Sequence, residues 1–375
     1  MIRLTIPTIE DDDLQAVQDA VASGFLVQGP RVAAFERAVA ERVGVKHAVA
    51  VSNCTCALHL ALLALDVRPG DLCVVTAYSW VSTANVVELC GARPVFVDVD
   101  LSTYNIDLDR LEKVLSQLMS NYATARRVKA VLPVHTFGHM ADMQGLIDLC
   151  GRWNLSVVED AACALGATLH GQQAGSWGEM GCFSFHPRKA ITTGEGGMVT
   201  TNDDAIARRL RALRNHGLDP EAASDFIIPG HNYRLTEFQA GLGSTQMTKL
   251  QRIIDARCTA AHRYDELLDG SPLQSPRVMS GAGHIYQSYV TLLPAEAAPQ
   301  RADLIRRAKE AGVETQIGTI HMPLTTFYRN QYGYRLGDFP TTDAVAARAL
   351  ALPLYETINA QLQRTVVEVV LKLLG

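Results

Sequence analysis

The chain has 375 residues, 48% of them hydrophobic and 19% charged, which is enough apolar material for a large buried core. A formal net charge of −5 argues against binding to nucleic acid or an anionic membrane surface. The eight cysteines show no CxxC pair or Cys/His ligand spacing, so we expect neither a disulfide framework nor a metal site. Residues 1–8 lack an apolar signal core, and no apolar run is long enough for a bilayer, so we expect a cytoplasmic protein.

The first two thirds of the chain alternate between two patterns. Continuous apolar runs, typical of strands covered on both faces, occupy residues 47–52, 73–77, 95–99, 130–135, 156–160, 182–185 and 197–201. Helical patterns occupy residues 31–43, 55–65, 143–152 and 203–216, the last with Gly217 as its C-cap. This alternation predicts an α/β fold with a largely parallel sheet. Ligands bind such sheets beyond the carboxyl ends of the strands, where Ser52, Asp160 and Phe185 fall.

The pattern changes near residue 250. Thr236 and Gln239 form a capping-box signature that opens a helix continuing past Leu250. Farther on, short strands are expected at 288–293 and 313–317, and helices at 300–311, 343–350 and 357–374. We therefore predict a large α/β domain over residues 1–250 and a smaller α+β domain over residues 251–375.

Two residues suggest a chemistry. Lys189 lies in a turn flanked by glycines, and Asp160 ends a predicted buried strand about thirty residues upstream. Such a lysine suits pyridoxal 5′-phosphate (PLP), because its amine can bond to the cofactor aldehyde. The carboxylate would keep the pyridine nitrogen protonated, so that the ring can accept electrons.

Further residues could complete a site for this cofactor. The backbone around Thr55 and Cys56 opens a helix after a strand, a geometry that binds phosphate. Trp80 could stack on the pyridine ring, and the Ser184 hydroxyl could reach the phosphate. Each also has a plain structural interpretation: a helix cap for Thr55, a core position for Trp80, and a backbone-bonded strand serine for Ser184.

The order of these motifs resembles one family. The string FSFHPRK, which ends at Lys189, the GEGG stretch at 194–197 and the polar loop at 230–241 are similar to the DegT/DnrJ/EryC1/StrS family. Its members are fold-type I PLP proteins that aminate keto-sugars, most often nucleotide-linked ones. The resemblance covers nearly the whole chain, from residue 23 to residue 355. It implies a mostly parallel seven-stranded sheet with helices on both faces.

The resemblance also implies roles for individual residues. Lys189 would bond to the cofactor, and Asp160 would face the pyridine nitrogen. The other implied cofactor contacts are Trp80 on the ring, Thr55, Cys56 and Ser184 at the phosphate, Cys163 at the phenolic oxygen, and Asn232 from the second subunit of a homodimer. Arg234, in the same loop as Asn232, becomes a candidate for contacting the substrate.

The sequence departs from the family at three places. Cys163 stands where the family usually has Gln or His, and a thiol is a weaker hydrogen-bond donor. The family's His-x-Tyr-His run appears as residues 284–287 with Gln287 last, and the segment around His321 is also altered. The resemblance implies that His321 and Tyr286 contact the substrate, and both lie in segments where this chain differs from the family pattern.

The expected reaction is a ping-pong transamination from L-glutamate to a nucleotide-linked keto-sugar. An acceptor such as a cyclitol ketone or another secondary-metabolite carbonyl is an alternative. Sugar dehydrases in the family resemble a version with histidine in place of the lysine, which Lys189 argues against. A non-catalytic PLP-binding regulator is a further alternative, but it would be expected to lose Lys189 or Asp160, and both are present. The setting, a cell-surface sugar or an antibiotic, stays open.

Overall fold

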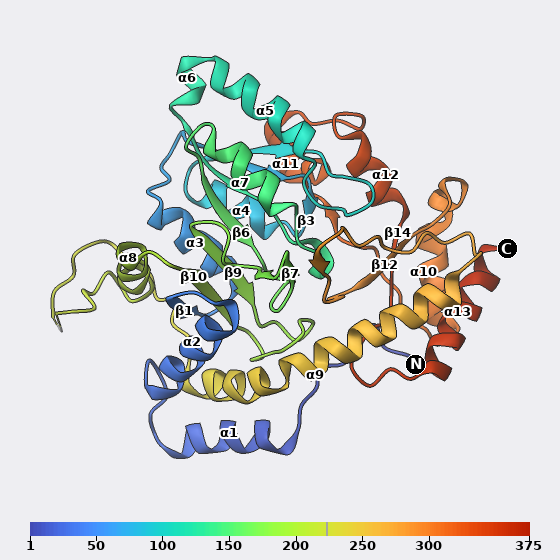
Figure 1. Ribbon diagram of the computed structural model, residues 1–375, viewed down its shortest axis with the longest axis horizontal. Coiled ribbons are helices and arrows are strands. Elements are labelled where there is room, and N and C mark those ends of the chain that lie inside the picture. Colours follow the sequence, from blue (N-terminus) through green and yellow to red (C-terminus); the bar gives the residue numbers. More distant parts are fainter. Residues whose placement is uncertain (223) are drawn as a thin grey trace.

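The computed structural model describes residues 1–222 and 224–375. Its centre is a seven-stranded sheet in the order β1-β10-β9-β6-β5-β2-β4, in which only β10 is antiparallel to its neighbours (Figure 1). The strands are β1 His47–Val51, β2 Leu72–Thr76, β4 Arg93–Val97, β5 Val128–Leu132, β6 Ser156–Asp160, β9 Met180–Ser184 and β10 Gly197–Thr201. The predicted mostly parallel sheet is confirmed. Several strands begin one or two residues before the predicted start, because hydrogen bonding rather than hydropathy sets strand ends.

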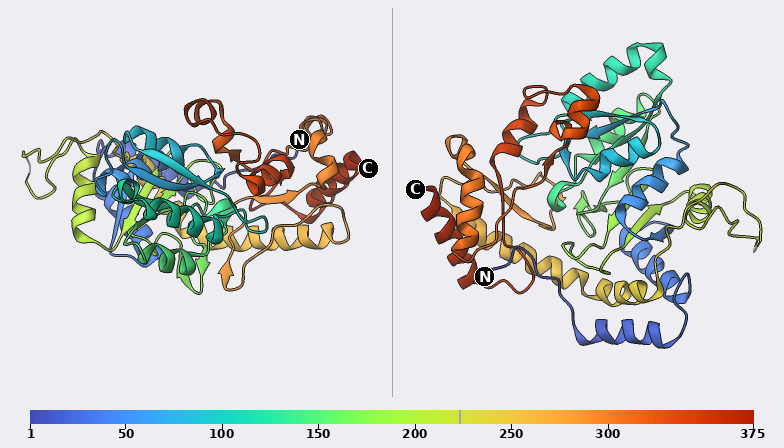
Figure 2. Two further views of the ribbon diagram at one scale, coloured as in Figure 1. Left: turned by 90° about the horizontal axis from the view of Figure 1, so that it is seen from above. Right: turned by 180° about the vertical axis from the view of Figure 1, so that it is seen from behind.

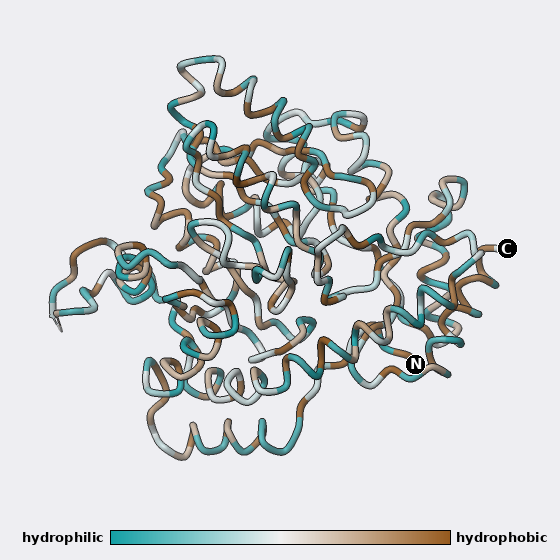
Figure 3. The backbone as a smooth tube through the Cα atoms, viewed as in Figure 1, coloured by the Kyte–Doolittle hydropathy of each residue, from teal (hydrophilic) through white to brown (hydrophobic). Residues whose placement is uncertain are grey.

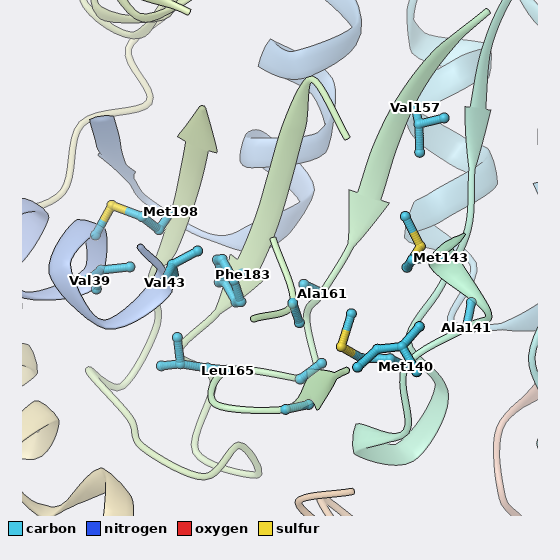
Figure 4. Packing of buried hydrophobic residues seen from close by; sticks show 14 of the residues in the cluster. Val39, Val43, Met140, Ala141, Met143, Val157, Ala161, Leu165, Phe183 and Met198 are labelled. Atoms are coloured by element: carbon cyan, nitrogen blue, oxygen red, sulfur yellow. The ribbon is translucent and has the colours of Figure 1, made fainter. Parts of the chain in front are cut away.

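Helices cover both faces of the sheet. One face packs against α2, α5, α7 and the first half of α9, and the other against α3, α4, α8 and α11. Figure 4 shows Val39 and Val43 of α2 beside Phe183 and Met198 of the sheet. The bounds are α1 Asp11–Ala22, α2 Pro30–Val43, α3 Cys54–Ala64, α4 Ser82–Leu89, α5 Leu108–Ser120, α6 Tyr122–Ala125, η1 Thr136–Gly138, α7 Met143–Gly151, α8 Asp204–Arg214 and α11 Thr326–Tyr332. Hydrophobic segments gather along the central strands in Figure 3. Burial on both faces explains why the strands are continuous apolar runs.

The start of α3 and the end of α8 differ from the predictions in their capping residues. Helix α3 begins at Cys54, and Asn53 is its N-cap through a 2.9 Å bond from the Cys56 N–H. Helix α8 ends at Arg214 with Asn215 as the C-cap, not Gly217. Gly217 lies beyond the cap with a φ of 85°, the left-handed conformation that glycine adopts without strain.

Helix α9, Glu237–Leu268, joins the sheet to the C-terminal part of the chain (Figures 1 and 2). The predicted capping box at its start is confirmed, and residue 250 lies inside this continuous helix. Helix α1 packs along α9, where Lys249 Nζ lies 2.7 Å from the buried Asp13 carboxylate. The N-terminus lies beside the C-terminal part of the chain, because Ile2 pairs with Val313, and the two termini therefore lie in the same region.

The C-terminal part of the chain has its own hydrophobic core, and its elements differ from the predictions at two places. Its elements, with the short strands that flank the main sheet, are β3 Tyr78–Ser79, β7 Thr168–Leu169, β8 Gln172–Gln173, β11 Ala282–Gly283, β12 Tyr289–Leu292, η2 Ala295–Gln300, α10 Arg301–Glu310, β13 Ile320–His321, η3 Met322–Leu324, α12 Pro340–Arg348, β14 Ala349–Leu352 and α13 Ala360–Leu374. Residues 313–317 do not form a strand and make only isolated bridges. Helix α12 starts earlier than predicted because Pro340 opens it, and its last predicted turn is instead β14, which pairs with β12. Within the described residues, no helix is long and apolar enough to cross a membrane.

Glu237 ties the start of α9 to the start of α2 and supports a stability prediction. Its fully buried carboxylate accepts bonds from the N–H groups of Gly29 (2.8 Å), Val32 (2.9 Å) and Arg31 (3.0 Å). Glu237→Gln should lower the free energy of unfolding by about 1.5–3 kcal/mol, since an amide NH₂ would face a backbone donor. Urea unfolding measures this loss. Glu41→Gln on exposed α2 surface should change little, and an equal loss in both variants would contradict the capping role.

Candidate active site

Asp160 ends β6 at the carboxyl edge of the sheet and is only 3% exposed. One carboxylate oxygen accepts a 2.6 Å bond from the Thr83 hydroxyl, and the other a 3.2 Å bond from the Ala162 N–H. Burial raises the pKa of Asp160, although these two bonds and the Lys189 ammonium oppose the rise. A buried carboxylate of this kind is stabilised by a cationic partner, which a protonated pyridine nitrogen would provide.

Thr83 was not predicted from the sequence, although it lies three residues after Trp80. Thr83→Val keeps the shape but removes the hydroxyl that favours the charged form of Asp160, so the pKa of Asp160 should rise further. A hydrogen bond to a charged group is worth about 1.5–3 kcal/mol, so kcat/KM for the amino donor should fall by roughly 10–100-fold. Thr83→Ser should restore most of the activity. If Val and Ser variants were equally active, the hydroxyl would have no such role.

Lys189 is held in a tight turn by its own neighbours. Its N–H donates to the His186 carbonyl at 2.8 Å, and His186 Nδ1 accepts the Arg188 N–H at 3.2 Å. His186 therefore shapes the turn before the lysine. The Lys189 Nζ lies 3.0 Å from the sulfur of Cys163. Because Cys163 follows Asp160 by three residues, the turn brings the amine to the carboxyl end of β6.

The charge on Lys189 reflects these neighbours. Burial by itself would lower the pKa of the ammonium group. Interactions with Cys163, Cys54 and Asp160 outweigh burial and leave the pKa of Lys189 above its ordinary value. Cys54 opens α3, so the same environment joins residues from α3, β6 and the lysine turn. The structure thus brings the two residues predicted as catalytic into one electrostatic site.

Ser184 lies beside the N-terminus of α3. Gly197 of β10 pairs with both Ser184 and Val51, and a Cβ added to Gly197 would collide with the backbone of Asn53. This close approach places the Ser184 strand next to the helix start, where an anion is favoured. Exposed Thr55 lies on that first turn. The N–H of Cys56 already donates to Asn53, so Cys56 has less to offer a phosphate than the sequence predicted.

Trp80 follows β3 and is 64% exposed, which contradicts the alternative that it belongs to the core. Its carbonyl accepts a 3.3 Å bond from the Thr83 hydroxyl, the same group that binds Asp160. The exposed indole, the buried carboxylate, the lysine amine and the helix N-terminus together fit the cofactor predicted from the sequence. PLP combines a flat ring, a protonated ring nitrogen, an aldehyde and an anionic phosphate, and each of these parts would meet a complementary group here.

His321 and Tyr286, which were predicted to contact the substrate, are bonded to or stacked on other side chains of the same chain. His321 of β13 pairs with Tyr78 of β3, and its Nε2 lies 2.8 Å from the Asp343 carboxylate. Tyr286 is buried in the C-terminal core, where its ring stacks on His284 with centroids 4.0 Å apart. Both side chains therefore already have partners within the chain.

Asn232 and Arg234 lie beyond the end of β1. Arg234 donates a 2.7 Å bond to the Asn215 side chain and pairs with Val51 through its backbone. Asn232 is exposed, and its backbone pairs with Asn215. Among the residues that the structure describes, no hydrogen bond joins either side chain to Lys189 of the same chain.

Gln287 is a contact that the sequence did not predict. Its side-chain amide donates to the Arg188 carbonyl, directly before Lys189, and its own carbonyl accepts a 3.0 Å bond from Arg257. Gln287 is the last residue of the run at 284–287 that departs from the family pattern. This departure is the sequence signal from which its contact could have been predicted. The C-terminal part therefore touches the lysine turn through Gln287 rather than Tyr286.

Gln287→Ala is expected to loosen this turn. The unfolding free energy should fall by about 1 kcal/mol for the lost hydrogen bond. Turnover should fall by about tenfold, since small misplacements of a reacting group are costly. PLP titration and steady-state kinetics measure both effects. Gln316→Ala is the matched control, because the exposed Gln316 side chain bonds to the Arg188 side chain at 3.5 Å and not, among the described residues, to the Arg188 carbonyl. Equal kinetics in the two variants would argue against positioning by Gln287.

Comparison with known proteins agrees with this geometry. Residues 7–371 match the model of the DegT/DnrJ/EryC1/StrS aminotransferase family. GDP-perosamine synthase of Caulobacter vibrioides is 37% identical over 318 residues, which cover 84% of this chain and 83% of that protein. UDP-4-amino-4-deoxy-L-arabinose–oxoglutarate aminotransferase of Shewanella sediminis is 31% identical, with coverage of 98% and 97%. The PLP form of Spr1654 from Streptococcus pneumoniae has a TM-score of 0.91 at 25% identity, covering 100% of this chain and 98% of that one.

Proposed function

The chain belongs to the DegT/DnrJ/EryC1/StrS aminotransferase family and is a PLP-dependent aminotransferase, and we propose that it transfers an amino group from L-glutamate to a nucleotide-linked keto-sugar. The observation that carries the proposal is the contact of the Lys189 amine with the site formed by Asp160 and Cys163. The sugar-nucleotide acceptor and the oxoglutarate product are supported by the names of the two relatives.

In this proposal each residue has a defined task. When bound, PLP supplies an electron sink for the carbon that gains or loses the amino group. Lys189 holds the cofactor and, once free, moves a proton to and from the substrate carbon as general base and acid. Asp160 would keep a proton on the pyridine nitrogen, and the Thr83 hydroxyl favours the charged form of Asp160 against the effect of burial. Trp80 covers the ring, and Ser184 with the start of α3 holds the phosphate.

The proposal includes a homodimer in which Asn232 of the partner subunit completes the site. In its own chain, the exposed Asn232 lies beside Asn215. Nearby, the large apolar side chains of Phe25 and Leu26 are about half exposed, and the Leu26 carbonyl accepts the Glu237 N–H. An apolar group of this kind next to the loop is a surface that a second copy could cover. The two half-reactions then proceed in a ping-pong order. Arg234 and His321, each also bonded to a side chain of its own subunit, are the proposed substrate contacts.

An absorbance titration tests the proposal. PLP bound to the purified protein should show the visible band of a lysine-linked cofactor, and excess L-glutamate should convert it to the near-ultraviolet band of the aminated cofactor. The aminated form is then mixed with each member of a panel of keto-sugar nucleotides, and with scyllo-inosose as the cyclitol control. The visible band should return only with the keto-sugar nucleotide that the enzyme accepts. Restoration by scyllo-inosose alone would replace the sugar proposal with the cyclitol alternative. A bound cofactor that ignores every amino donor would overturn the proposed reaction.

A further inference from the structure

The contact between Lys189 and Cys163 brings the side-chain nitrogen of a lysine within 3.0 Å of a sulfur. Both residues are partly exposed over the residue as a whole. Cys54 and Cys182 share the same electrostatic environment but are buried, and burial raises the pKa of both thiols. Among these three thiols, Cys163 is therefore the accessible one, and its adjacent partner is an amine rather than a second thiol.

We propose that Cys163 is a reversible oxidation site at which hydrogen peroxide joins its sulfur to the Lys189 nitrogen. In the first step the sulfur attacks peroxide, giving sulfenic acid and one water. In the second step the Lys189 ammonium group first loses one proton to solvent. The resulting amine attacks that sulfur, the S–O bond breaks, and the departing hydroxide takes a further amine proton as a second water. Sulfenic acids condense with nitrogen in this way to form sulfenamides. The protein loses two hydrogens and two electrons, and peroxide is reduced to two waters.

The geometry favours this outcome over further oxidation. A sulfenic acid avoids further oxidation to sulfinic acid when a nucleophile reacts with it before a second peroxide molecule does. Lys189 Nζ is already in contact with the sulfur, at the end of a long and flexible side chain. A thiol reductant would attack the sulfur of the S–N bond and return both residues to their original state.

The bond would act as a switch on cofactor loading. The Lys189 nitrogen cannot be bonded to Cys163 and to a cofactor aldehyde at once. Oxidation should therefore trap the cofactor-free protein, and bound PLP should protect it. This second expectation rests on the proposed role of Lys189, whereas formation of the S–N bond does not.

Mass spectrometry of the cofactor-free protein tests the proposal. After brief treatment with hydrogen peroxide, we expect an intact mass lower by two hydrogens and a tryptic map in which the Cys163 peptide is joined to Lys189, with no cleavage after that lysine. Dithiothreitol should reverse both changes. The Cys54→Ser/Cys182→Ser double variant should still form the product, whereas Cys163→Ser and Lys189→Arg should not.

Several results would overturn the inference. A disulfide between Cys163 and Cys54 also removes two hydrogens, but its peptide map would join two cysteines and would disappear in the double variant. Mass gains from added oxygen alone would show that Lys189 does not capture the sulfur. If the S–N bond forms equally fast in protein reconstituted with PLP, the oxidation site stands and the cofactor role of Lys189 is wrong.

Discussion

Replacing Lys189 with alanine is expected to abolish amino transfer, with a loss of ~10⁴-fold or more. The variant loses both the amine that holds the cofactor and the group that moves the proton. The structure supports one amine for both tasks, because its Nζ lies in the same electrostatic site as Asp160. Single-turnover conversion of bound PLP by L-glutamate, followed by absorbance, measures the loss directly.

Arg188→Ala is the matched control for Lys189→Ala. Arg188 is the exposed neighbour in the same turn, and within the described part of the chain its side chain hydrogen-bonds to Gln316 alone, at 3.5 Å. This control should retain most of the activity, and circular dichroism should show both variants folded. Added methylamine should recover part of the lost rate by supplying an external base. Undiminished conversion in Lys189→Ala would refute the assignment.

Asp160→Asn is the second substitution with a large expected effect. Removing the charge opposite the pyridine nitrogen should lower turnover by about 10³-fold, the scale of one lost preorganised electrostatic contact. The amide can keep the local hydrogen bonds, since its oxygen can accept the Ala162 N–H and the Thr83 hydroxyl can rotate to accept from the NH₂. Steady-state kinetics with PLP in excess separate this loss from weaker cofactor binding.

The same substitution should stabilise the cofactor-free protein at neutral pH. Because burial raises the pKa of Asp160, the folded state binds its proton more tightly than the unfolded chain does. The stability of cofactor-free wild type should therefore fall as the pH rises from the ordinary carboxyl value through the raised folded value. Asparagine does not titrate, so the variant should lack this loss, and the two proteins should converge in acid. Urea unfolding across this range would contradict the account if the variant were less stable at neutral pH.

Much of the fold could be predicted from the chain itself because the relevant signals are local. A strand buried on both faces must be apolar along its whole length, so the seven central strands appear as apolar runs. The capping box at Thr236 and the turn before Lys189 each depend on residues within a few positions of one another. The residues 313–317 show the limit of this signal. They carry β-branched side chains at Val313, Thr315 and Ile317, which favours a strand, but their neighbours in space allow only isolated bridges.

The sequence by itself determined the mostly parallel sheet and placed Lys189 in a turn, and it predicted that Lys189 and Asp160 act together at a cofactor site. Only the tertiary structure decided that Thr83 holds Asp160, that Gln287 holds the turn, and that the Cys163 sulfur meets the lysine amine. These contacts join segments between 26 and 99 residues apart along the chain. No local pattern encodes such a contact, because it exists only after the intervening strands and helices have packed and brought the two segments together.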